Sequence, residues 1–406
     1  MPGPGTFLTG EEEKKEILDV LESGYLFRYG SEDDVNFKHK VAMFEKEFAE
    51  YCGVKYCVAV SSGTASLITS LHALGIGAGD EVIVPGYTFI ASIGSIIYSN
   101  AIPVLAEIDE SLTIDPADIE KKITKKTKAI MPVHMLGNPC NMEEILTIAK
   151  KHNLYILEDA CQATGASYKG KKVGTMGNIG AFSLNFFKTL STGDGGMLVT
   201  SDYKIYERAF SFHDQGHLPN RLGVEVGKRS LIGINFRMNE LTGAVALAQA
   251  RKLERIISTL QAKKKKLKDA ISDINGISFR KINDDGECAT LLTLLFETKE
   301  KADKFCEKVG TKTLYHSGWH VYNNMENILG KKMSTEISCP FECPYYGKKV
   351  EYSHHMLPKT DDILQRAVNI SVGVVDSGLG AGFGINILSS DEDIENCARA
   401  IRKAMM

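Results

Sequence analysis

Between about residue 55 and residue 200, short runs rich in β-branched and apolar residues alternate with stretches of helical periodicity. This alternation is typical of a mainly parallel sheet flanked by helices, because each parallel connection crosses the sheet and usually does so as a helix. The expected helices are residues 10–23, 64–74 and 142–152, and the expected strands are residues 56–60, 81–84, 102–107, 129–133, 154–157, 180–183 and 196–200. The sequence therefore predicts an α/β fold.

The chain is long enough to need two domains, because 406 residues exceed what one hydrophobic core usually organises. A pattern rich in Ala, Leu, Lys and Arg runs from Asn239 to about Ile274 and predicts one long helix that joins the two domains. We therefore expect a large domain over residues 1–255 and a small domain over residues 256–406. Patterns at residues 277–280, 290–296 and 391–404 predict two strands and a closing helix, so the small domain is expected to be α+β.

The composition is that of a globular protein without a membrane or nucleic-acid partner. No stretch approaches the roughly 20 consecutive apolar residues of a membrane span, and residues 1–5 have neither the basic nor the apolar part of a secretion signal. The formal net charge is −3, and the basic run Lys263–Lys266 lies in an amphipathic stretch where a solvated helix face explains it. We expect a cytoplasmic protein.

The nine cysteines do not form a disulfide framework, because their number is odd and their spacing is irregular. They fit a reducing compartment. Cys339 and Cys343, followed by His354 and His355, could surround a zinc ion, but the spacing is a loose match to known zinc sites. No metal is expected.

An anion site is one of two interpretations of Ser61–Ala65, which follow an expected strand and open an expected helix. Free backbone N–H groups and the helix dipole would point at the anion, and Gly63 would let it approach closely. The alternative is an ordinary helix cap, since Ser, Gly and Thr are common there. The glycine-dense segment Gly378–Gly384 lacks a strand before it and a helix directly after, so we expect a turn or a mobile flap rather than a dinucleotide loop.

Asp159 follows an apolar strand, at the end where open α/β sheets place their ligands. A pyridinium ring that acts as an electron sink needs an anionic partner for its ring nitrogen, and Asp159 suits that task. A helix cap or a loop hydrogen bond is the alternative interpretation of such an aspartate.

Lys188 lies just beyond an expected strand and just before a glycine-rich turn. A lysine that forms a Schiff base with a cofactor aldehyde has to reach it and later move aside, which suits a loop at the edge of the sheet. Ser183, five residues earlier, is placed to reach a phosphate. The order of anion-binding helix start, strand-end Asp159 and post-strand Lys188 predicts a pyridoxal-phosphate (PLP) enzyme.

Six ordered motifs carry a resemblance to a known family. They are residues 62–65, 85–89, 132–137, 158–162, 183–196 and 233–240. Together they resemble the successive signatures of the DegT-type sugar aminotransferases, which are PLP enzymes of fold type I that act on keto or aldehyde sugars. The resemblance spans roughly the first two thirds of the chain and weakens after it.

The resemblance implies a cofactor phosphate held by Gly63 and Thr64, with a further contact from Ser183. It also implies that Asn235 reaches the phosphate from the neighbouring subunit. A site of this kind requires a homodimer.

The resemblance further implies the roles around the cofactor ring. Phe89 would stack on the pyridine ring, and Asp159 would pair with the ring nitrogen. Gln162 would contact the ring hydroxyl, and Lys188 would form the Schiff base. In the implied reaction, L-glutamate or glutamine donates the amino group. Lys188 moves the proton between the Cα of the amino donor and the C4′ of the cofactor.

Within the family, the subgroup that aminates C8 of a 3-deoxy-octulosonate looks closest, because of short motifs at residues 1–3, 27–29, 214–217 and 318–320. Arg28 and His217 are its candidate substrate residues. Such amino sugars enter cell-surface polysaccharides and lipopolysaccharide. A nucleotide-linked keto sugar is the alternative acceptor.

Two other functions fit the same fold. A PLP-dependent sugar dehydratase would carry histidine in place of the Schiff-base lysine, whereas this chain has Lys188. A non-catalytic regulator that binds PLP or a sugar would have no use for Asp159, Gln162 and Lys188 together. Fold alone separates neither function from a transaminase.

Overall fold

The computed structural model describes residues 2–31, 33–219, 229–335 and 339–406. Its centre is a seven-stranded sheet with the strand order β1-β9-β8-β5-β4-β2-β3. The strands are β1 (Tyr56–Val60), β2 (Glu81–Pro85), β3 (Ile102–Ala106), β4 (Thr127–Ile130), β5 (Tyr155–Asp159), β8 (Ile179–Ser183) and β9 (Gly196–Thr200). All seven predicted strands are present, with ends shifted by up to three residues.

Six of the seven strands run in one direction, and β9 runs against both of its neighbours. β2, β8 and β9 are buried along their whole length, as expected for strands covered on two faces. The α/β fold predicted from the sequence is therefore confirmed, and the reversed direction of β9 is an addition to it.

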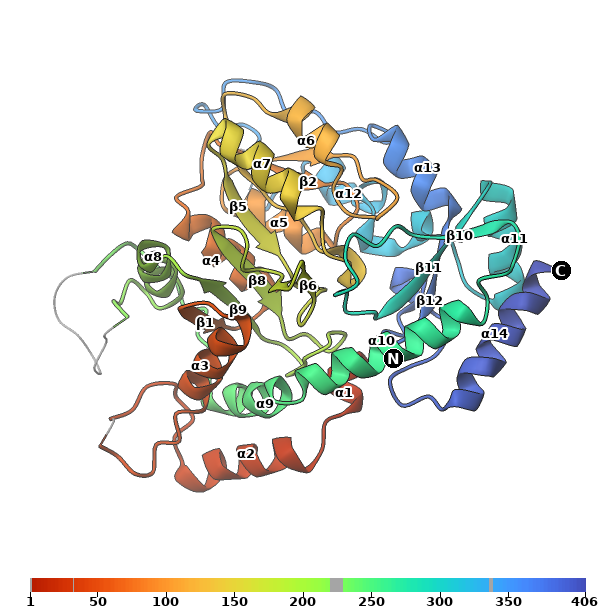
Figure 1. Cartoon of the computed structure of the whole chain (residues 1–406). Helices are drawn as coiled ribbons and strands as arrows, with labels where there is room; N and C mark the ends of the chain where they lie inside the picture. Colours follow the sequence, from red (N-terminus) through yellow and green to blue (C-terminus); the bar gives the residue numbers. More distant parts are fainter. Residues whose placement is uncertain (1, 32, 220–228, 336–338) are drawn as a thin grey trace.

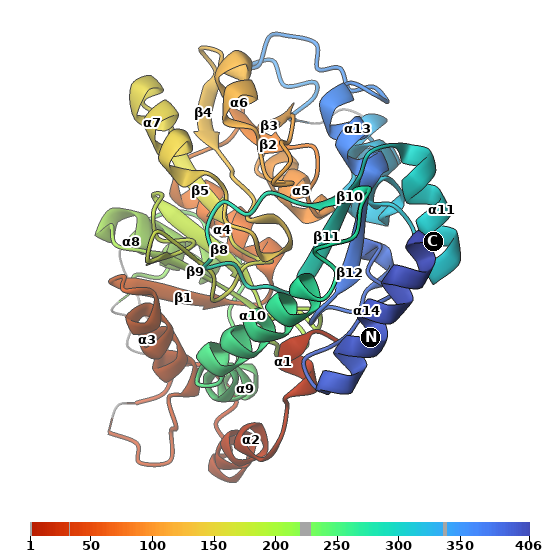
Figure 2. The ribbon, with the colours of Figure 1, turned by 45° about the vertical axis from the view of Figure 1, so that its right-hand side comes forward.

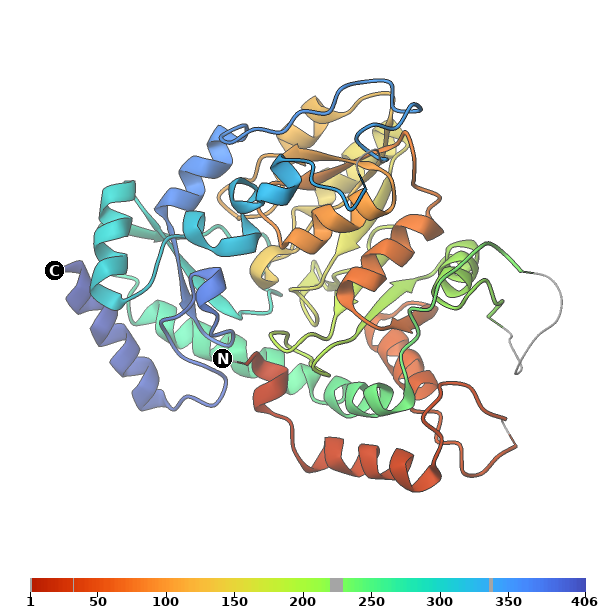
Figure 3. The ribbon, with the colours of Figure 1, turned by 180° about the vertical axis from the view of Figure 1, so that it is seen from behind.

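Helices cover both faces of this sheet (Figure 1 and, from behind, Figure 3). On one face, apolar side chains of α4 (Gly63–Ala73), α5 (Ile90–Tyr98) and α8 (Tyr203–His213) form one core. The other face is covered by α3 (Lys40–Cys52), α6 (Pro116–Lys122), α7 (Met142–His152) and α9 (Glu240–Ala250).

The long helix predicted over residues 239–274 is in fact two helices, α9 and α10 (Leu253–Asp269). At the break, Arg251 ion-pairs with Glu47 of α3 at 2.6 Å, and Lys252 ion-pairs at 2.8 Å with Glu13 of α2 (Glu11–Ser23). These contacts turn the two cations toward neighbouring helices. The prediction of helical structure over these residues was correct, but the prediction of one continuous helix was wrong.

α10 leads to a second, antiparallel sheet with the order β10-β11-β12 (Figure 2). It consists of β10 (Ile277–Phe279), β11 (Leu291–Phe296) and β12 (Ala367–Ser371). The sequence predicted the first two strands but not β12. α10, α11 (Lys299–Val309) and α14 (Asp391–Met405) share one apolar core with this sheet. Shorter elements are α1 (Pro4–Phe7), α12 (Glu326–Leu329), α13 (Pro358–Arg366), β6 (Ser167–Tyr168), β7 (Lys171–Lys172) and 3₁₀ turns at Met135–Gly137, Leu314–His316, Gly318–His320, Tyr322–Asn324 and Ser377–Leu379.

Within the described parts of the chain, no helix is both long and apolar enough to cross a membrane.

Candidate active site

A cavity of about 550 Å³ lies where β5 and β8 end and α4 begins, and segments that follow β11 and β12 line its other side. This is the edge at which open α/β sheets bind ligands. The cavity brings together most of the residues predicted from the sequence: Gly63, Thr64, Phe89, Asp159, Gln162, Ser183 and Lys188.

The start of α4 has the features of both an ordinary helix cap and an anion site, the two interpretations of its sequence. Ser62 caps the helix, because its Oγ accepts a hydrogen bond from the Ala65 N–H at 3.0 Å. The first N–H groups of a helix have no partner within the helix, and Gly63 and Thr64 both line the cavity. A Cβ added at Gly63 would lie 2.6 Å from the Cβ of Ser183 and 3.3 Å from the Sγ of Cys161. Only glycine lets the helix start lie this close to the end of β8.

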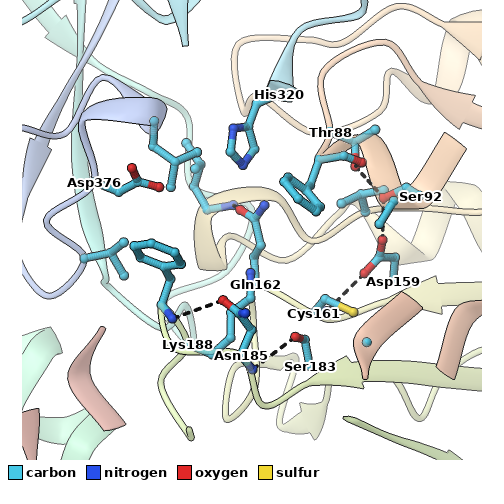
Figure 4. Close-up of a pocket in the computed structure, with 18 of the residues that line it drawn as sticks. Thr88, Ser92, Asp159, Cys161, Gln162, Ser183, Asn185, Lys188, His320 and Asp376 are labelled. Atoms are coloured by element: carbon cyan, nitrogen blue, oxygen red, sulfur yellow. Dashed lines mark hydrogen bonds between the residues drawn. The ribbon is translucent and has the colours of Figure 1, made fainter. Parts of the chain in front are cut away.

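Asp159 is held by hydrogen bonds to both of its carboxylate oxygens (Figure 4). The Ser92 hydroxyl donates to Oδ2 at 2.6 Å, and the Cys161 N–H donates to Oδ1 at 3.1 Å. Thr88 Oγ1 lies 2.7 Å from Ser92 Oγ. Because the single proton of Ser92 goes to the carboxylate, Thr88 is the donor to Ser92. The hydrogen bond from the Cys161 N–H is the loop hydrogen bond considered from the sequence. Each carboxylate oxygen can accept more than one hydrogen bond, so Asp159 can still accept from a cationic N–H.

Lys188 presents an amine without a hydrogen-bond or ion-pair partner among the described residues. Burial lowers the pKa of Lys188 below its usual value, although the nearby Cys161, Asp159 and Asp376 act in the opposite direction. A lowered pKa increases the share of the neutral amine, which is the form that attacks a carbonyl carbon.

Gln162 is oriented by the loop that follows β4. Its Oε1 accepts a hydrogen bond from the Leu136 N–H at 3.1 Å, so only its NH₂ group remains to face the cavity, as a donor. Leu136 has a left-handed backbone (φ 56°), and its carbonyl accepts from Arg280 Nη2 at 2.9 Å.

Three lining residues that sequence reasoning did not assign come from the second sheet and its connections. Thr290 directly precedes β11, His320 follows β11, and Asp376 follows β12. Burial lowers the pKa of His320 to about 3, so its ring is neutral near pH 7. The His320 Nδ1–H donates to the Ser317 carbonyl at 3.2 Å, which leaves Nε2 as an acceptor. The His320 ring lies 5.3 Å from the Phe89 ring. Asp376 has no local signal in the sequence, although the glycine-dense segment beside it forms the expected turn.

Arg28, His217 and Asn235 are not among the described residues that line the cavity. Arg28 is buried, and its Nη2 ion-pairs with Glu45 at 2.9 Å, so its charge is already neutralised. The substrate role of Arg28 stays a prediction. Asn235 is exposed, and its Oδ1 accepts from the Arg237 N–H at 3.2 Å. The roles of His217 and Asn235 stay predictions.

The histidines considered for zinc face carboxylates instead of Cys339 and Cys343. His355 Nδ1 lies 2.9 Å from an oxygen of Asp361, and His354 Nε2 lies 3.7 Å from Glu326. The described residues contain no group of three or more His, Cys, Asp or Glu placed to hold a metal ion.

The cavity fits pyridoxal phosphate by four features. A helix start with free N–H groups suits the phosphate, and the buried carboxylate of Asp159 suits a cationic ring nitrogen. The amide of Gln162 presents donors to a ring oxygen. The amine of Lys188 has no hydrogen-bond or ion-pair partner among the described residues.

Residues 8–375 match the family model described as the DegT/DnrJ/EryC1/StrS aminotransferase family. A relative named GDP-perosamine synthase, from Escherichia coli O157:H7, is 44% identical over 252 residues, which are 62% of this chain and 66% of that protein. The match thus spans slightly less than two thirds of the E. coli protein. The spore coat polysaccharide biosynthesis protein SpsC of Bacillus subtilis (strain 168) is 33% identical over 404 residues, which are 97% of this chain and 95% of SpsC.

The aminotransferase from Psychrobacter cryohalolentis has a similar crystal structure. The two chains superpose with a TM-score of 0.79 at 26% identity, over 99% of this chain and 98% of that one. The likeness therefore includes the segments after β11 and β12 that line the cavity.

Proposed function

Since this chain belongs to the DegT/DnrJ/EryC1/StrS aminotransferase family, we propose that it transfers an amino group from L-glutamate or L-glutamine to a nucleotide-linked keto sugar. The cofactor is pyridoxal phosphate. The observation that carries this proposal is the free amine of Lys188 in one cavity with the hydrogen-bonded carboxylate of Asp159.

Bound pyridoxal phosphate supplies an electron sink and a carbon that carries the amino group between the two substrates. Lys188 would hold the cofactor through a covalent link at Nζ. When a substrate amine takes that place, the freed Nζ would accept the proton from the substrate Cα and later return one. Burial lowers the pKa of Lys188, which increases the share of its neutral amine, the form that accepts a proton.

Other residues bind and orient the cofactor. Asp159 would keep the ring nitrogen protonated, and the NH₂ group of Gln162 would donate to the ring oxygen. Phe89 would pack against the ring. The N–H groups of Gly63 and Thr64 would bind the phosphate.

The name of the E. coli relative, GDP-perosamine synthase, supports a nucleotide-linked acceptor, and the name of the B. subtilis relative supports a role in polysaccharide biosynthesis. A 3-deoxy-octulosonate aldehyde is the second candidate acceptor. It is favoured by one observation: Trp319 and His320, which belong to the motif that resembled that subgroup, line the cavity.

A screen of acceptors tests the proposal. The enzyme is loaded with pyridoxamine phosphate, and keto and aldehyde sugars, free and nucleotide-linked, are scored for return of the pyridoxal absorption band. We expect nucleotide-linked keto sugars to restore the band. Restoration by the octulosonate aldehyde alone would favour the second candidate, and restoration by no sugar would reject the acceptor class.

The same absorption band separates a transaminase from its two competitors. A regulator would keep the pyridoxal band when L-glutamate is added, whereas a transaminase loses it. A dehydratase would consume a sugar without transferring nitrogen to it, and the chain carries the lysine that the dehydratases replace.

We also propose a homodimer, in which Asn235 completes the phosphate site of the opposite subunit. Charge supports this: Lys188 is the only cationic side chain among the described residues that line the cavity, whereas Asp159, Asp194 and Asp376 are acidic. A phosphate and the carboxylates of glutamate need more donors than one subunit offers.

Subunit mixing checks the dimer proposal. Lys188→Ala and Asn235→Ala proteins are each expected to be severely impaired. After exchange in equal amounts, about a quarter of the sites should combine an intact Lys188 with an intact Asn235, because half of the dimers are mixed and each has one such site. Activity should therefore recover. No recovery in proven heterodimers would place Asn235 in the same subunit as Lys188, or outside the site.

A further inference from the structure

The N-terminal segment of the chain lies directly against the backbone of Lys188. We call residues 3–8 the strap and residues 184–195 the Lys188 loop. The Gly3 N–H donates to the Phe186 carbonyl at 3.0 Å, and the Gly5 N–H donates to the Lys188 carbonyl at 3.2 Å. The hydroxyl of Thr6 also donates to the Phe186 carbonyl, at 2.9 Å. Met1 lies outside the described residues.

Two glycines of the strap are required by this close approach. A Cβ added at Gly3 would lie 2.2 Å from the carbonyl carbon of Phe187 and 2.8 Å from the backbone nitrogen of Lys188. At Gly5 it would lie 2.7 Å from the backbone nitrogen of Ser191. These distances are shorter than any tolerated contact of a Cβ with backbone atoms, so the two chains lie too close for a side chain at either position.

The far end of the strap is fixed at the break between α9 and α10. Glu13, which is 1% exposed, accepts from the Gly10 N–H at 2.7 Å, from Gln249 Nε2 at 2.7 Å and from Lys252 Nζ at 2.8 Å. Lys252 Nζ also donates to the Leu8 carbonyl at 2.9 Å. The strap is therefore anchored by a buried carboxylate at the point where α9 ends, and α1 lies beside this point in each view of the fold (Figures 1 to 3).

The strap also contacts the segment that lines the opposite side of the cavity. A Cβ at Gly373, just after β12, would lie 3.0 Å from Cγ of Pro4. Phe7 and Leu8 pack against the core of the second sheet. The strap thus lies between the Lys188 loop and the β12 segment, which continues to Val374 and Asp376 in the cavity wall.

We propose that the strap is a positioning element that fixes the backbone of Lys188, so that the side chain alone moves when the amine is bound and released. This inference rests on the proposed function of Lys188. A lysine side chain has four rotatable bonds, and a reacting group has to be placed within a fraction of an ångström by the atoms that support it. The carbonyls of residues 186 and 188 are the atoms that the strap holds.

Gly3→Ala and Gly5→Ala test the strap, and Gly10→Ala is the matched control. A Cβ at Gly10 meets nothing closer than the flexible carboxylate of Glu12 at 3.7 Å. In the cofactor-loaded full chain, we expect both strap variants to speed amide hydrogen exchange at residues 186–191. The rate of the L-glutamate half-reaction should fall by up to about 100-fold, because a misplacement of about 1 Å costs that much. Gly10→Ala should change neither quantity.

Borohydride reduction followed by peptide mass analysis gives a readout that needs no substrate, since it measures the fraction of Lys188 linked to the cofactor. If wild-type Lys188 is not linked, the proposed function fails. If it is linked, and the strap variants match Gly10→Ala in exchange and in half-reaction rate, the strap proposal fails alone.

A purely structural role would give a different result. The melting temperature would fall, exchange would rise throughout the chain, and the half-reaction rate per bound cofactor would stay at the wild-type value. That outcome would overturn the proposal. Should the alanine variants not fold, Thr6→Val removes one hydrogen bond without a clash. It should raise exchange at residues 186–191 by a smaller amount, and unchanged exchange there would reject the strap as a positioning element.

Discussion

Lys188→Ala is expected to abolish transamination and to leave the fold intact. Its amine has no hydrogen-bond or ion-pair partner among the described residues, so its loss leaves no buried group unpaired and should change the melting temperature little. The proton transfer alone is typically worth about 10²–10⁴-fold, and the covalent link is lost as well. The half-reaction with L-glutamate, followed by the absorption of the bound cofactor, measures the effect.

Lys188→Arg is the control for size and charge. A guanidinium is always protonated and does not form an imine, so this variant should be as inactive as Lys188→Ala. Appreciable transamination by either variant would show that another lysine carries the cofactor.

Asp159→Asn should give the second largest loss, because it removes the anion opposite the ring nitrogen. Removal of one preorganised electrostatic partner typically costs about 2.7–4 kcal/mol, or roughly 10²–10³-fold in kcat. The amide oxygen can still accept from Ser92, and the start of α4 is unchanged, so the cofactor should remain bound through its phosphate. Steady-state kinetics measures the loss of kcat, and equilibrium dialysis measures how tightly the cofactor is bound.

Asp194→Asn is the matched control for Asp159→Asn. Asp194 also lines the cavity, but it is exposed, and its Oδ1 accepts from Asn185 Nδ2 at 3.0 Å. We expect a much smaller loss of kcat. If Asp159→Asn is no worse than Asp194→Asn, the carboxylate of Asp159 serves only its hydrogen bonds with Ser92 and Cys161.

The strands were predictable because each is an apolar run of about five residues between Gly, Pro and polar residues, a pattern set locally. The direction of β9 was not, since antiparallel pairing with β1 and β8 depends on how the Lys188 loop folds back. The break between α9 and α10 was missed for a related reason. Arg251 and Lys252 are good helix formers, and the carboxylates that pull them aside lie more than 200 residues earlier in the chain.

The part of the site that lies at strand ends was predictable, because position in the α/β alternation locates Gly63, Asp159 and Lys188. Ser92 carries no signal, since it is a hydroxyl among the apolar residues of α5. Asp376 reaches the cavity only through the packing of the second sheet against the first. The ion pair of Arg28 with Glu45 of α3 could not be predicted from the sequence, because the two residues meet only in the folded chain.

The wide spread of the cavity residues along the chain bears on when a newly made protein can acquire its cofactor. The seven-stranded sheet is complete once residue 200 has been synthesised, because its strands lie between residues 56 and 200. The wall opposite Lys188 comes from Thr290, His320 and Asp376, which emerge from the ribosome much later. Domains generally fold as units, N-terminal parts first. The amine of Lys188 would thus lack this wall while the residues between Lys188 and Asp376 are synthesised, and tight retention of the cofactor would report that the second sheet has packed against the first.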